Sequence, residues 1–437
     1  MKLHDKLNKL DLYPLHMPGH KRSAKFGIAG AEIDITEIEG FDNLHEASGA
    51  LLDIENKLQA IYKSKKSFML VNGSTVGILS AIYALCKTGD KIIIARNCHK
   101  SVYNACMLLK LKVVYIEPEF DAECGYYKGV TQKAVDEAVS ANMDAKAVVI
   151  TSPTYEGYVS EVKCDIPLII DAAHGAHFGQ EGFPAYPKGD IVISSLHKTL
   201  PALTQTAVAN IYNKELISKF KSFSDIFETS SPSYVLMNSV DICTDYMLKN
   251  ADEFLSFSER LNDFRSIELS KLRIRNTDDK SKIIISTAAC DINGAELADR
   301  LRGYGFEPEG VSKDYVILIT TVADEQEVLD KLKASLISID KSVNKSEFKP
   351  FKKPFVPNGE QVIATSEISE KTPINEAEGK VSNEFVYAYP PDIPLLAPNE
   401  VITADAISYI NELIENGVNV ISDSSLLPSM LLTKGKN

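Results

Sequence analysis

Three groups of polar residues follow short apolar runs of the sequence, which is where α/β proteins bind their ligands. The first group is Asn72-Gly73-Ser74-Thr75-Val76-Gly77, after the apolar run 68–71. Gly73 permits a tight turn, and the hydroxyls of Ser74 and Thr75 stand beside the free N–H groups of a predicted helix start. This pattern predicts either a phosphate site or an ordinary helix N-cap. It matches neither of the glycine-rich nucleotide-binding motifs.

The second group follows the apolar run 167–171, which ends at Asp171. A carboxylate at the end of a buried strand needs a cationic partner if it is to stay ionised, although an aspartate can also cap the following turn. His174 and His177 come next, three positions apart as in some metal sites. No third ligand is evident in the sequence, so we predict no metal.

The third group, residues 194–199, contains Ser195, His197 and Lys198 after an apolar run. Most lysines are solvated, but one that follows a buried strand is a candidate for a lowered pKa and Schiff-base chemistry. Lys198 comes 27 positions after Asp171. A lysine for the Schiff base, an aspartate for the pyridine nitrogen and a phosphate cradle are what pyridoxal phosphate enzymes require. The three groups together therefore predict a pyridoxal phosphate site.

Alternating strands and helices must position these groups. Amphipathic runs between the early apolar runs predict helices over 76–87 and 101–110. The predicted strands are 68–71, 91–95, 112–116, 146–151, 167–171, 190–195 and 206–212. Nearly continuous apolar strands separated by helices indicate an α/β fold with a mostly parallel central sheet covered on both faces.

The later part of the chain changes in character. Long helices are predicted over 234–272, a smaller α/β unit over 281–337, and a last helix over 403–416. Lys, Ser, Glu and Pro dominate residues 340–380, which is typical of a linker or a long loop. We expect five segments, namely an N-terminal arm with an acidic segment (1–60), a cofactor-binding large domain (61–272), a small α/β domain (273–340), a linker or long loop (341–380) and a C-terminal unit (381–437).

Composition excludes several classes of protein. The 437 residues are 44% hydrophobic and 24% charged, with a net charge of −13 and seven cysteines that form no C-x-x-C pair. These values exclude a disordered or fibrous chain and argue against a nucleic-acid partner and a disulfide framework. No apolar run approaches the ~18 residues of a membrane span, and no signal-peptide pattern is evident. We therefore expect a cytoplasmic protein with no membrane partner.

The negative charge is concentrated in one segment. Residues 31–60 carry eight acidic residues against Lys57 alone, whereas residues 1–30 are basic. Such a segment is either a solvated acidic face or a surface that attracts a cationic substrate. The charge alone leaves both interpretations open.

Several motifs resemble those of the bacterial ornithine/lysine/arginine decarboxylases, in the short form that lacks an N-terminal wing domain. The motifs are Met17-Pro18-Gly19-His20-Lys21, the run Thr36–Gly49 with Asn43-Leu44-His45, Asn72-Gly73-Ser74-Thr75, Arg96-Asn97-Cys98-His99-Lys100-Ser101 and Ser195-Leu196-His197-Lys198. The resemblance extends from about residue 14 to about residue 240 and again over 389–400. It implies the aminotransferase-like fold of pyridoxal phosphate enzymes and a homodimer whose active sites are shared between the chains.

The resemblance also implies a role for each candidate residue. Lys198 would form the Schiff base with pyridoxal phosphate, and Asp171 would hold the pyridine nitrogen. His99, which is otherwise a helix-start histidine, would stack on the cofactor ring, and His174 would lie close to the ring on the side of Asp171. The phosphate would be held by Ser74, Thr75, Ser195 and His197. Ser231 lies in a segment that, by resemblance, reaches the phosphate in the partner subunit.

The implied activity is decarboxylation of a basic amino acid, with arginine ahead of lysine and ornithine, releasing carbon dioxide and a polyamine-type amine. Lys198 or His197 would return a proton to Cα after carbon dioxide leaves. The alternatives are an aminotransferase or another pyridoxal phosphate lyase of the same fold, and a catalytically silent relative that binds the cofactor.

Three positions depart from the family pattern. Asp392 and Asn399 stand where the family usually has glycine, and both residue types tolerate left-handed backbone angles. Glu156 stands where aromatic or aliphatic residues are usual. We expect Glu156 either to face solvent or to pair with a basic side chain.

Overall fold

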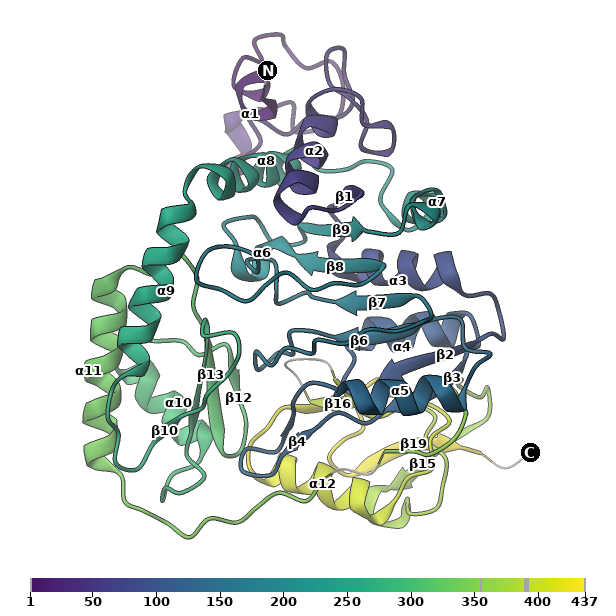
Figure 1. Ribbon diagram of the computed structural model, residues 1–437, viewed down its shortest axis with the longest axis vertical. Coiled ribbons are helices and arrows are strands. Elements are labelled where there is room, and N and C mark those ends of the chain that lie inside the picture. Colours follow the sequence, from purple (N-terminus) through teal and green to yellow (C-terminus); the bar gives the residue numbers. More distant parts are fainter. Residues whose placement is uncertain (1, 354–355, 389–392, 436–437) are drawn as a thin grey trace. The chain divides into compact units, whose positions relative to one another are not determined.

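The structure is a computed structural model that describes residues 2–353, 356–388 and 393–435. The chain divides into two units, each built from two stretches of sequence. Unit 1 comprises Met1–Ala84 and Ile169–Leu255, and unit 2 comprises Leu85–Leu168 and Ser256–Asn437 (Figure 1). The five predicted segment boundaries stay a prediction.

Four strands of unit 1 lie side by side. Their order is β1 (Lys66–Leu70), β9 (Ala207–Ile211), β8 (Ile191–Ser195) and β7 (Leu168–Asp171). β7 and β8 are parallel, with Asp171 opposite Ile193, and β9 runs against both β8 and β1. Almost every residue of these strands is buried, which explains their continuous apolar sequences. Because β7 and β8 are parallel, their carboxyl ends lie at the same end of the sheet.

Unit 1 also contains several helices. They are α1 (Leu3–Leu7), α2 (Ala50–Tyr62), α3 (Gly73–Leu85), α6 (Leu196–Thr199), α7 (Ile217–Phe227) and α8 (Tyr234–Lys249), with 3-10 turns at Ala24–Phe26, Leu44–Glu46 and Lys214–Leu216. α2 lies against α8 and β1 (Figure 1). α3 packs closely on the strands because Gly77 has no side chain. A Cβ at Gly77 would lie 2.8 Å from Ile193 Cγ2 and 2.9 Å from Leu70 Cδ1.

Asp42, in the acidic segment 31–60, fixes the start of α2. Its carboxylate accepts hydrogen bonds at 2.9–3.3 Å from the backbone N–H groups of Ser48, Gly49, Ala50 and Leu51. Partial burial opposes ionisation of Asp42, but these donors outweigh it and lower its pKa below the ordinary value. In the same segment, buried Glu55 pairs with Lys66 at 2.5 Å. Part of the acidic segment therefore has a structural role.

Unit 2 has its own strands and a hairpin. The strand order is β6 (Val148–Thr151), β2 (Lys91–Ala95), β3 (Lys112–Ile116) and β14 (Gln361–Val362). The first three are parallel, and β14 runs against β3. Helices α4 (Lys100–Leu108) and α5 (Gln132–Ala141) and the hairpin of β4 (Phe120–Asp121) with β5 (Tyr126–Tyr127) occur between these strands in the sequence.

A second, antiparallel sheet belongs to the same unit. Its strand order is β10 (Arg273–Ile274), β11 (Lys282–Ser286), β13 (Tyr315–Ile319) and β12 (Gly310–Val311). The helices of this region are α9 (Ala251–Arg265), α10 (Gly294–Gly303) and α11 (Gln326–Ser342). α10 packs on β13 and β12.

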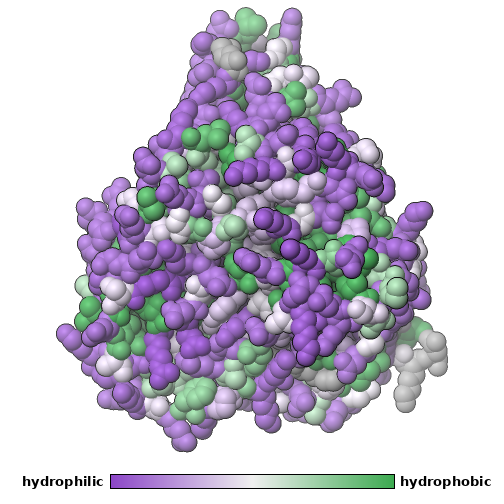
Figure 2. Space-filling view, in the orientation of Figure 1, coloured by the Kyte–Doolittle hydropathy of each residue, from purple (hydrophilic) through white to green (hydrophobic). Residues whose placement is uncertain are grey.

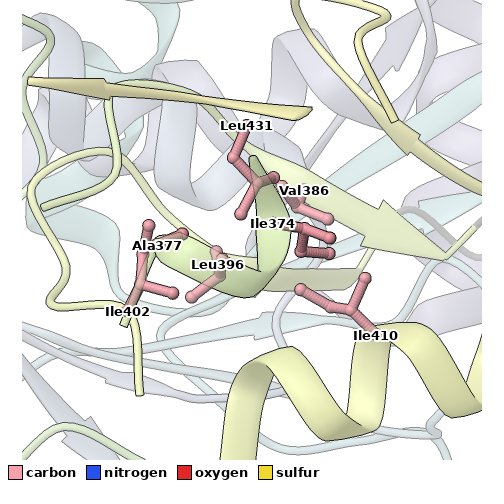
Figure 3. Packing of buried hydrophobic residues seen from close by; sticks show 7 residues of the cluster. All are labelled: Ile374, Ala377, Val386, Leu396, Ile402, Ile410 and Leu431. Carbon is pink, nitrogen blue, oxygen red and sulfur yellow. The ribbon is translucent and has the colours of Figure 1, made fainter. Parts of the chain in front are cut away.

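The C-terminal part of unit 2 has a core of its own. β15 (Ser369–Pro373) pairs with β19 (Met430–Lys434), and β16 (Val386–Ala388) lies between β17 (Ile393–Leu396) and β18 (Val420–Ser422). α12 (Ala404–Glu415) and the 3-10 turn Ile374–Glu376 complete it. Figure 3 shows its buried cluster, which consists of Ile374, Ala377, Val386, Leu396, Ile402, Ile410 and Leu431.

The predicted strands and most predicted helices are confirmed to within a few residues, and so is the α/β class. The helices predicted over 234–272 are α8 and α9, which end at Arg265. The segment 341–380, expected as a linker or long loop, contains β14 and β15. These strands pair with β3 and β19, which are distant in sequence, so local composition does not reveal them. Asn399 has the left-handed φ of 77° that its residue type tolerates. Asp392 lies outside the described residues.

Glu156 differs from both expectations. It is only 4% exposed, so it does not face solvent, and within the described ranges no ion pair forms with it. The loop after β6 packs against β11 and β13, and Glu156 accepts hydrogen bonds from Thr154 and Tyr315. At neighbouring Gly157 a Cβ would lie 2.8 Å from Lys282 Cγ, which shows how tight this packing is.

The visible face in Figure 2 is mainly hydrophilic, with hydrophobic residues scattered across it. Hydrophobic residues that are exposed singly are normal and need no partner. In the described part of the chain, no helix is both long enough and apolar enough to cross a bilayer.

Candidate active site

Asp171 is the last residue of β7 and is 3% exposed. Its Oδ1 accepts the backbone N–H of Ala173 at 3.1 Å. Burial raises the pKa of the Asp171 carboxyl, while the charge of Lys198 and this N–H oppose the rise. A carboxylate has about four acceptor positions, so Asp171 can accept a further N–H donor or cation.

Lys198 follows β8, the strand next to β7, and so lies at the same end of the sheet as Asp171. β8 ends at Ser195 and α6 begins at the next residue, so Lys198 stands on a single helical turn directly after the strand. Its Nζ lies 3.1 Å from Nε2 of His174, which follows β7. Because β7 and β8 are parallel neighbours, the residues that follow them meet. The contact between His174 and Lys198 was not predicted from the sequence.

Two buried hydroxyl groups flank Lys198. Ser195 is 1% exposed and Thr199 is 3% exposed, and neither hydroxyl oxygen has a hydrogen-bond partner among the described residues. A buried hydroxyl without a partner costs about 1–3 kcal/mol, so each of these two gains from a polar ligand that hydrogen-bonds to it. Ser195 was a predicted site residue. Thr199 was missed, although its position next to Lys198 was a signal that could have found it.

His197 is held by the backbone after β8. Its Nδ1 lies 2.9 Å from the carbonyl oxygen of Thr206, to which it donates. Burial lowers the pKa of His197, the Thr206 contact opposes this, and the charge of Lys198 lowers it further. His197 is therefore a neutral imidazole near neutral pH, with the proton on Nδ1 and a lone pair on Nε2.

The predicted phosphate turn opens α3. The helix begins at Gly73, three residues earlier than predicted, so Ser74 and Thr75 occupy its first turn. The N–H groups of a first turn have no partner within the helix. Gly73 has a left-handed φ of 79° and donates its N–H to the Gln205 carbonyl at 2.8 Å. This backbone conformation explains why glycine stands at position 73.

A buried carboxyl that sequence reasoning missed lies beside this turn. Thr229 donates its N–H to Asn72 Oδ1 at 3.1 Å, which brings residues 228–229 to the turn. Glu228 is 7% exposed, and burial raises its pKa to about 7. A carboxyl that is about half protonated near pH 7 repels a nearby phosphate less than a fully ionised one. No motif singled out Glu228.

The remaining predicted residues are placed as follows. His99 caps α4 in unit 2, where its Nδ1 accepts the N–H of Ser101 at 3.2 Å, and its stacking on a cofactor stays a prediction. Ser231 is exposed on unit 1 and donates its N–H to Thr229 Oγ1 at 3.2 Å. The ring of His177 packs against the rings of Phe178 and Phe183, with centroids 4.9 Å apart, whereas His174 contacts Lys198.

Residues 13–348 match the family described as Orn/Lys/Arg decarboxylase, major domain. Residues 345–419 match the family described as Orn/Lys/Arg decarboxylase, C-terminal domain. The chain belongs to the Orn/Lys/Arg decarboxylase family. The resemblance drawn from the sequence motifs is confirmed, and the protein is an amino acid decarboxylase.

Similar proteins agree with this membership. An arginine decarboxylase of Bacillus subtilis (strain 168) is 29% identical over 93% of this chain and 91% of its own length. The solved structure of the constitutive lysine decarboxylase of E. coli aligns with a TM-score of 0.76 at 17% identity, over 99% of this chain and 81% of that one. A structure of SPT with PLP aligns with a TM-score of 0.51 at 12% identity, over 67% and 76%. For this member of the Orn/Lys/Arg decarboxylase family, the predicted fold class is confirmed.

Proposed function

We propose that this chain is a pyridoxal-phosphate-dependent decarboxylase of a basic amino acid, with arginine preferred over lysine and ornithine. One observation carries the proposal. Lys198 and Asp171 stand at the ends of adjacent parallel strands, next to the buried hydroxyl of Ser195, which has no partner among the described residues. An amine, a carboxyl and a free hydroxyl correspond to the three groups that anchor this cofactor, at its carbonyl carbon, its ring nitrogen and its phosphate.

The residues present fit pyridoxal phosphate. Asp171 would hold the ring nitrogen, Lys198 would attach the cofactor, and His99 would stack on its ring. The phosphate would be held by the hydroxyls of Ser74, Thr75 and Ser195. His197 would join them only when its Nε2 carries a proton, because its Nδ1 proton is engaged by the Thr206 carbonyl. When bound, the cofactor supplies a sink for the electron pair that remains when carbon dioxide leaves. The buried position of Asp171 keeps its carboxylate away from water, which strengthens its interaction with a ring cation.

Lys198 is better suited than His197 to return the proton to Cα. The Nδ1 proton of His197 is engaged by the Thr206 carbonyl, and the lowered pKa of His197 leaves its Nε2 without a proton. His174 Nε2 lies within hydrogen-bond distance of the Lys198 amine. We therefore assign proton donation to Lys198 and orientation of its amine to His174.

A cationic substrate agrees with the surface charge of unit 1. Five acidic residues of the segment 31–60 are exposed, namely Glu32, Glu37, Glu39, Glu46 and Asp53. They would favour the encounter with a cationic amino acid, through an attraction that salt weakens. The preference for arginine is supported by the Bacillus subtilis relative, which aligns over nearly the whole chain and is an arginine decarboxylase.

The enzyme would act as a homodimer with shared active sites. This part of the proposal rests on the family resemblance, and Ser231, which is exposed on the single chain, is accessible to a second copy. Sedimentation of the purified protein should give the mass of a dimer. A monomer with full activity would contradict this part of the proposal.

Activity is tested by offering arginine, lysine and ornithine in turn to the purified, cofactor-loaded protein while carbon dioxide and amine are measured. We expect the highest kcat/KM with arginine. A 2-oxo acid in place of carbon dioxide would instead favour the aminotransferase alternative. A visible Schiff base without turnover of any amino acid would favour the silent relative.

Two variants test the site residues. Lys198→Ala should lower kcat by about 10³-fold or more and abolish the cofactor adduct that borohydride fixes on this residue. Asp171→Ala should remove most of the activity and leave some cofactor bound. The exposed residues Lys219 and Asp252 provide matched controls, Lys219→Ala and Asp252→Ala, which should behave as wild type. Full activity in Asp171→Ala would refute the assignment.

A further inference from the structure

Unit 2 contains a cavity that none of the residues assigned to the cofactor lines. It measures about 100 Å³ and lies among the β4–β5 hairpin, the loop after β6, strands β12 and β13, and helix α12. A bound water needs ~10–15 Å³ of such space, so the cavity has room for a ligand of roughly six or seven non-hydrogen atoms.

Glu156 is the negatively charged residue of the cavity lining, and it is buried. Burial raises its pKa to about 7, against hydrogen bonds from Thr154 and Tyr315 and the charge of Lys282. None of the described residues forms an ion pair with Glu156. A buried carboxyl of this kind gains from any cation that enters, because the cation favours its ionised form in a medium of low dielectric constant.

Arg96 is the positively charged residue of the lining, but other protein groups already bind its guanidinium and neutralise its charge. One guanidinium nitrogen donates to Tyr103 Oη at 2.7 Å and to the Pro394 carbonyl at 2.8 Å. The other reaches the Leu395 carbonyl at 3.2 Å and Glu400 Oε2 at 3.3 Å. With Arg96 balanced by Glu400, ionised Glu156 is the remaining charge of the lining itself, and buried Lys282, which lies outside the lining, offsets part of it.

The rest of the wall is strongly aromatic. Five tyrosines line the cavity, namely Tyr126, Tyr127, Tyr155, Tyr315 and Tyr409. Four of their hydroxyls are engaged by the protein. Tyr409 donates to the Gly125 carbonyl at 2.9 Å, Tyr126 contacts Tyr158 at 3.0 Å, Tyr155 donates to Glu309 Oε1 at 3.5 Å, and Tyr315 donates to Glu156. Their rings therefore remain as the surface that these residues offer to a ligand. Tyrosine rings attract organic cations through the negative face of the ring.

We infer that this cavity is a binding site for a small organic cation, an alkylammonium ion of about six non-hydrogen atoms whose charge lies against Glu156 and whose chain lies among the tyrosine rings. A carboxylate combined with aromatic rings selects a cation that also has an apolar part. An inorganic cation would gain little from the rings, and a neutral alcohol would gain nothing from the charge. This inference goes beyond the proposed decarboxylation and does not depend on it.

The test is calorimetric titration of the holoenzyme with n-pentylammonium chloride, with 1-pentanol as the neutral ligand of matched size. Wild type should bind pentylammonium with a dissociation constant of about 1 mM or tighter. Glu156→Gln should weaken that binding at least ~10-fold and leave the weak binding of pentanol unchanged. Glu137→Gln is the matched control, because it removes the same charge from a side chain that is 69% exposed. It should bind as wild type does.

A second variant, Tyr127→Leu, tests the inference independently in case Glu156→Gln does not fold. Tyr127→Leu should weaken the binding of pentylammonium several-fold more than the binding of pentanol, because only the cation uses the ring face. Lys198→Ala should retain the binding, which separates this cavity from the catalytic lysine. The inference is overturned if wild type binds nothing up to about 10 mM, if both ligands bind alike, or if Glu156→Gln binds as wild type does. Binding without any decarboxylation would contradict the proposed function alone.

Discussion

Glu156→Gln is expected to change how the stability of the protein depends on pH. Burial raises the pKa of Glu156 from the ordinary 4.5 to about 7 in the folded chain. Below about pH 4.5 the carboxyl is neutral in both states, so the folded state bears no penalty. As the pH rises from about 4.5 to about 7, the unfolded chain loses this proton and the folded chain keeps it, so stability falls. A rise of about 2.5 in pKa corresponds to roughly 3 kcal/mol in the free energy of unfolding. Above about pH 7 the folded protein has lost this whole amount of stability.

The assay is urea unfolding followed by circular dichroism, at about pH 4.5 and about pH 8, in buffers that contain no organic cation. The free energy of unfolding of Glu156→Gln relative to wild type should be roughly 3 kcal/mol higher at the upper pH than at the lower one. For the exposed control Glu137→Gln, the free energy of unfolding relative to wild type should be the same at both pH values. A difference for Glu156→Gln that does not change with pH would refute the reasoning, because it would mean that the carboxyl ionises normally in the folded chain.

Three further substitutions test single features of unit 1. Gly77→Ala should destabilise the protein by about 1–3 kcal/mol in thermal unfolding, because the new Cβ would lie 2.8 Å from Ile193 Cγ2. Asp42→Ala should cost about 1–2 kcal/mol near neutral pH, because four N–H groups at the start of α2 lose their acceptor. Since the folded-state pKa of Asp42 is lowered, this contribution is present above its ordinary pKa and disappears as the pH falls through the lowered value. Ser195→Ala should not lower the unfolding temperature of the cofactor-free protein, because the hydroxyl that it removes has no partner among the described residues, and it should weaken pyridoxal phosphate retention several-fold in equilibrium dialysis.

Each of these substitutions has a control or an outcome that would contradict it. Gly303→Ala adds a Cβ with no atom within 4 Å, so it should not destabilise the protein. An Asp42→Ala deficit that persisted at low pH would show that the carboxylate is not the source of the stability. Unchanged cofactor retention in Ser195→Ala would mean that the buried hydroxyl does not touch the phosphate.

Much of the fold follows from local pattern. Strands such as β7 and β8 are buried along nearly their whole length, so their residues must be continuously apolar, and this requirement is visible in the sequence. The residues that follow such strands are equally visible, which is why Asp171 and Lys198 could be named before any geometry was known. The short strands β14 and β15 could not be named, because each forms only by pairing with a strand distant in the chain.

The sequence by itself determined the α/β class, the positions of the strand ends and the family, because hydrophobic periodicity and contiguous motifs are local properties of the chain. Tertiary structure alone decided which of those residues meet. The order of β7 and β8 brings His174 to Lys198, and it leaves the Ser195 hydroxyl without a partner among the described residues. Packing of the loop after β6 buries Glu156, which sequence reasoning placed in solvent or in an ion pair. The pKa values and the unsatisfied hydrogen-bonding groups depend on burial and on contacts between residues that are distant in sequence. The local sequence pattern contains no information on either burial or such contacts.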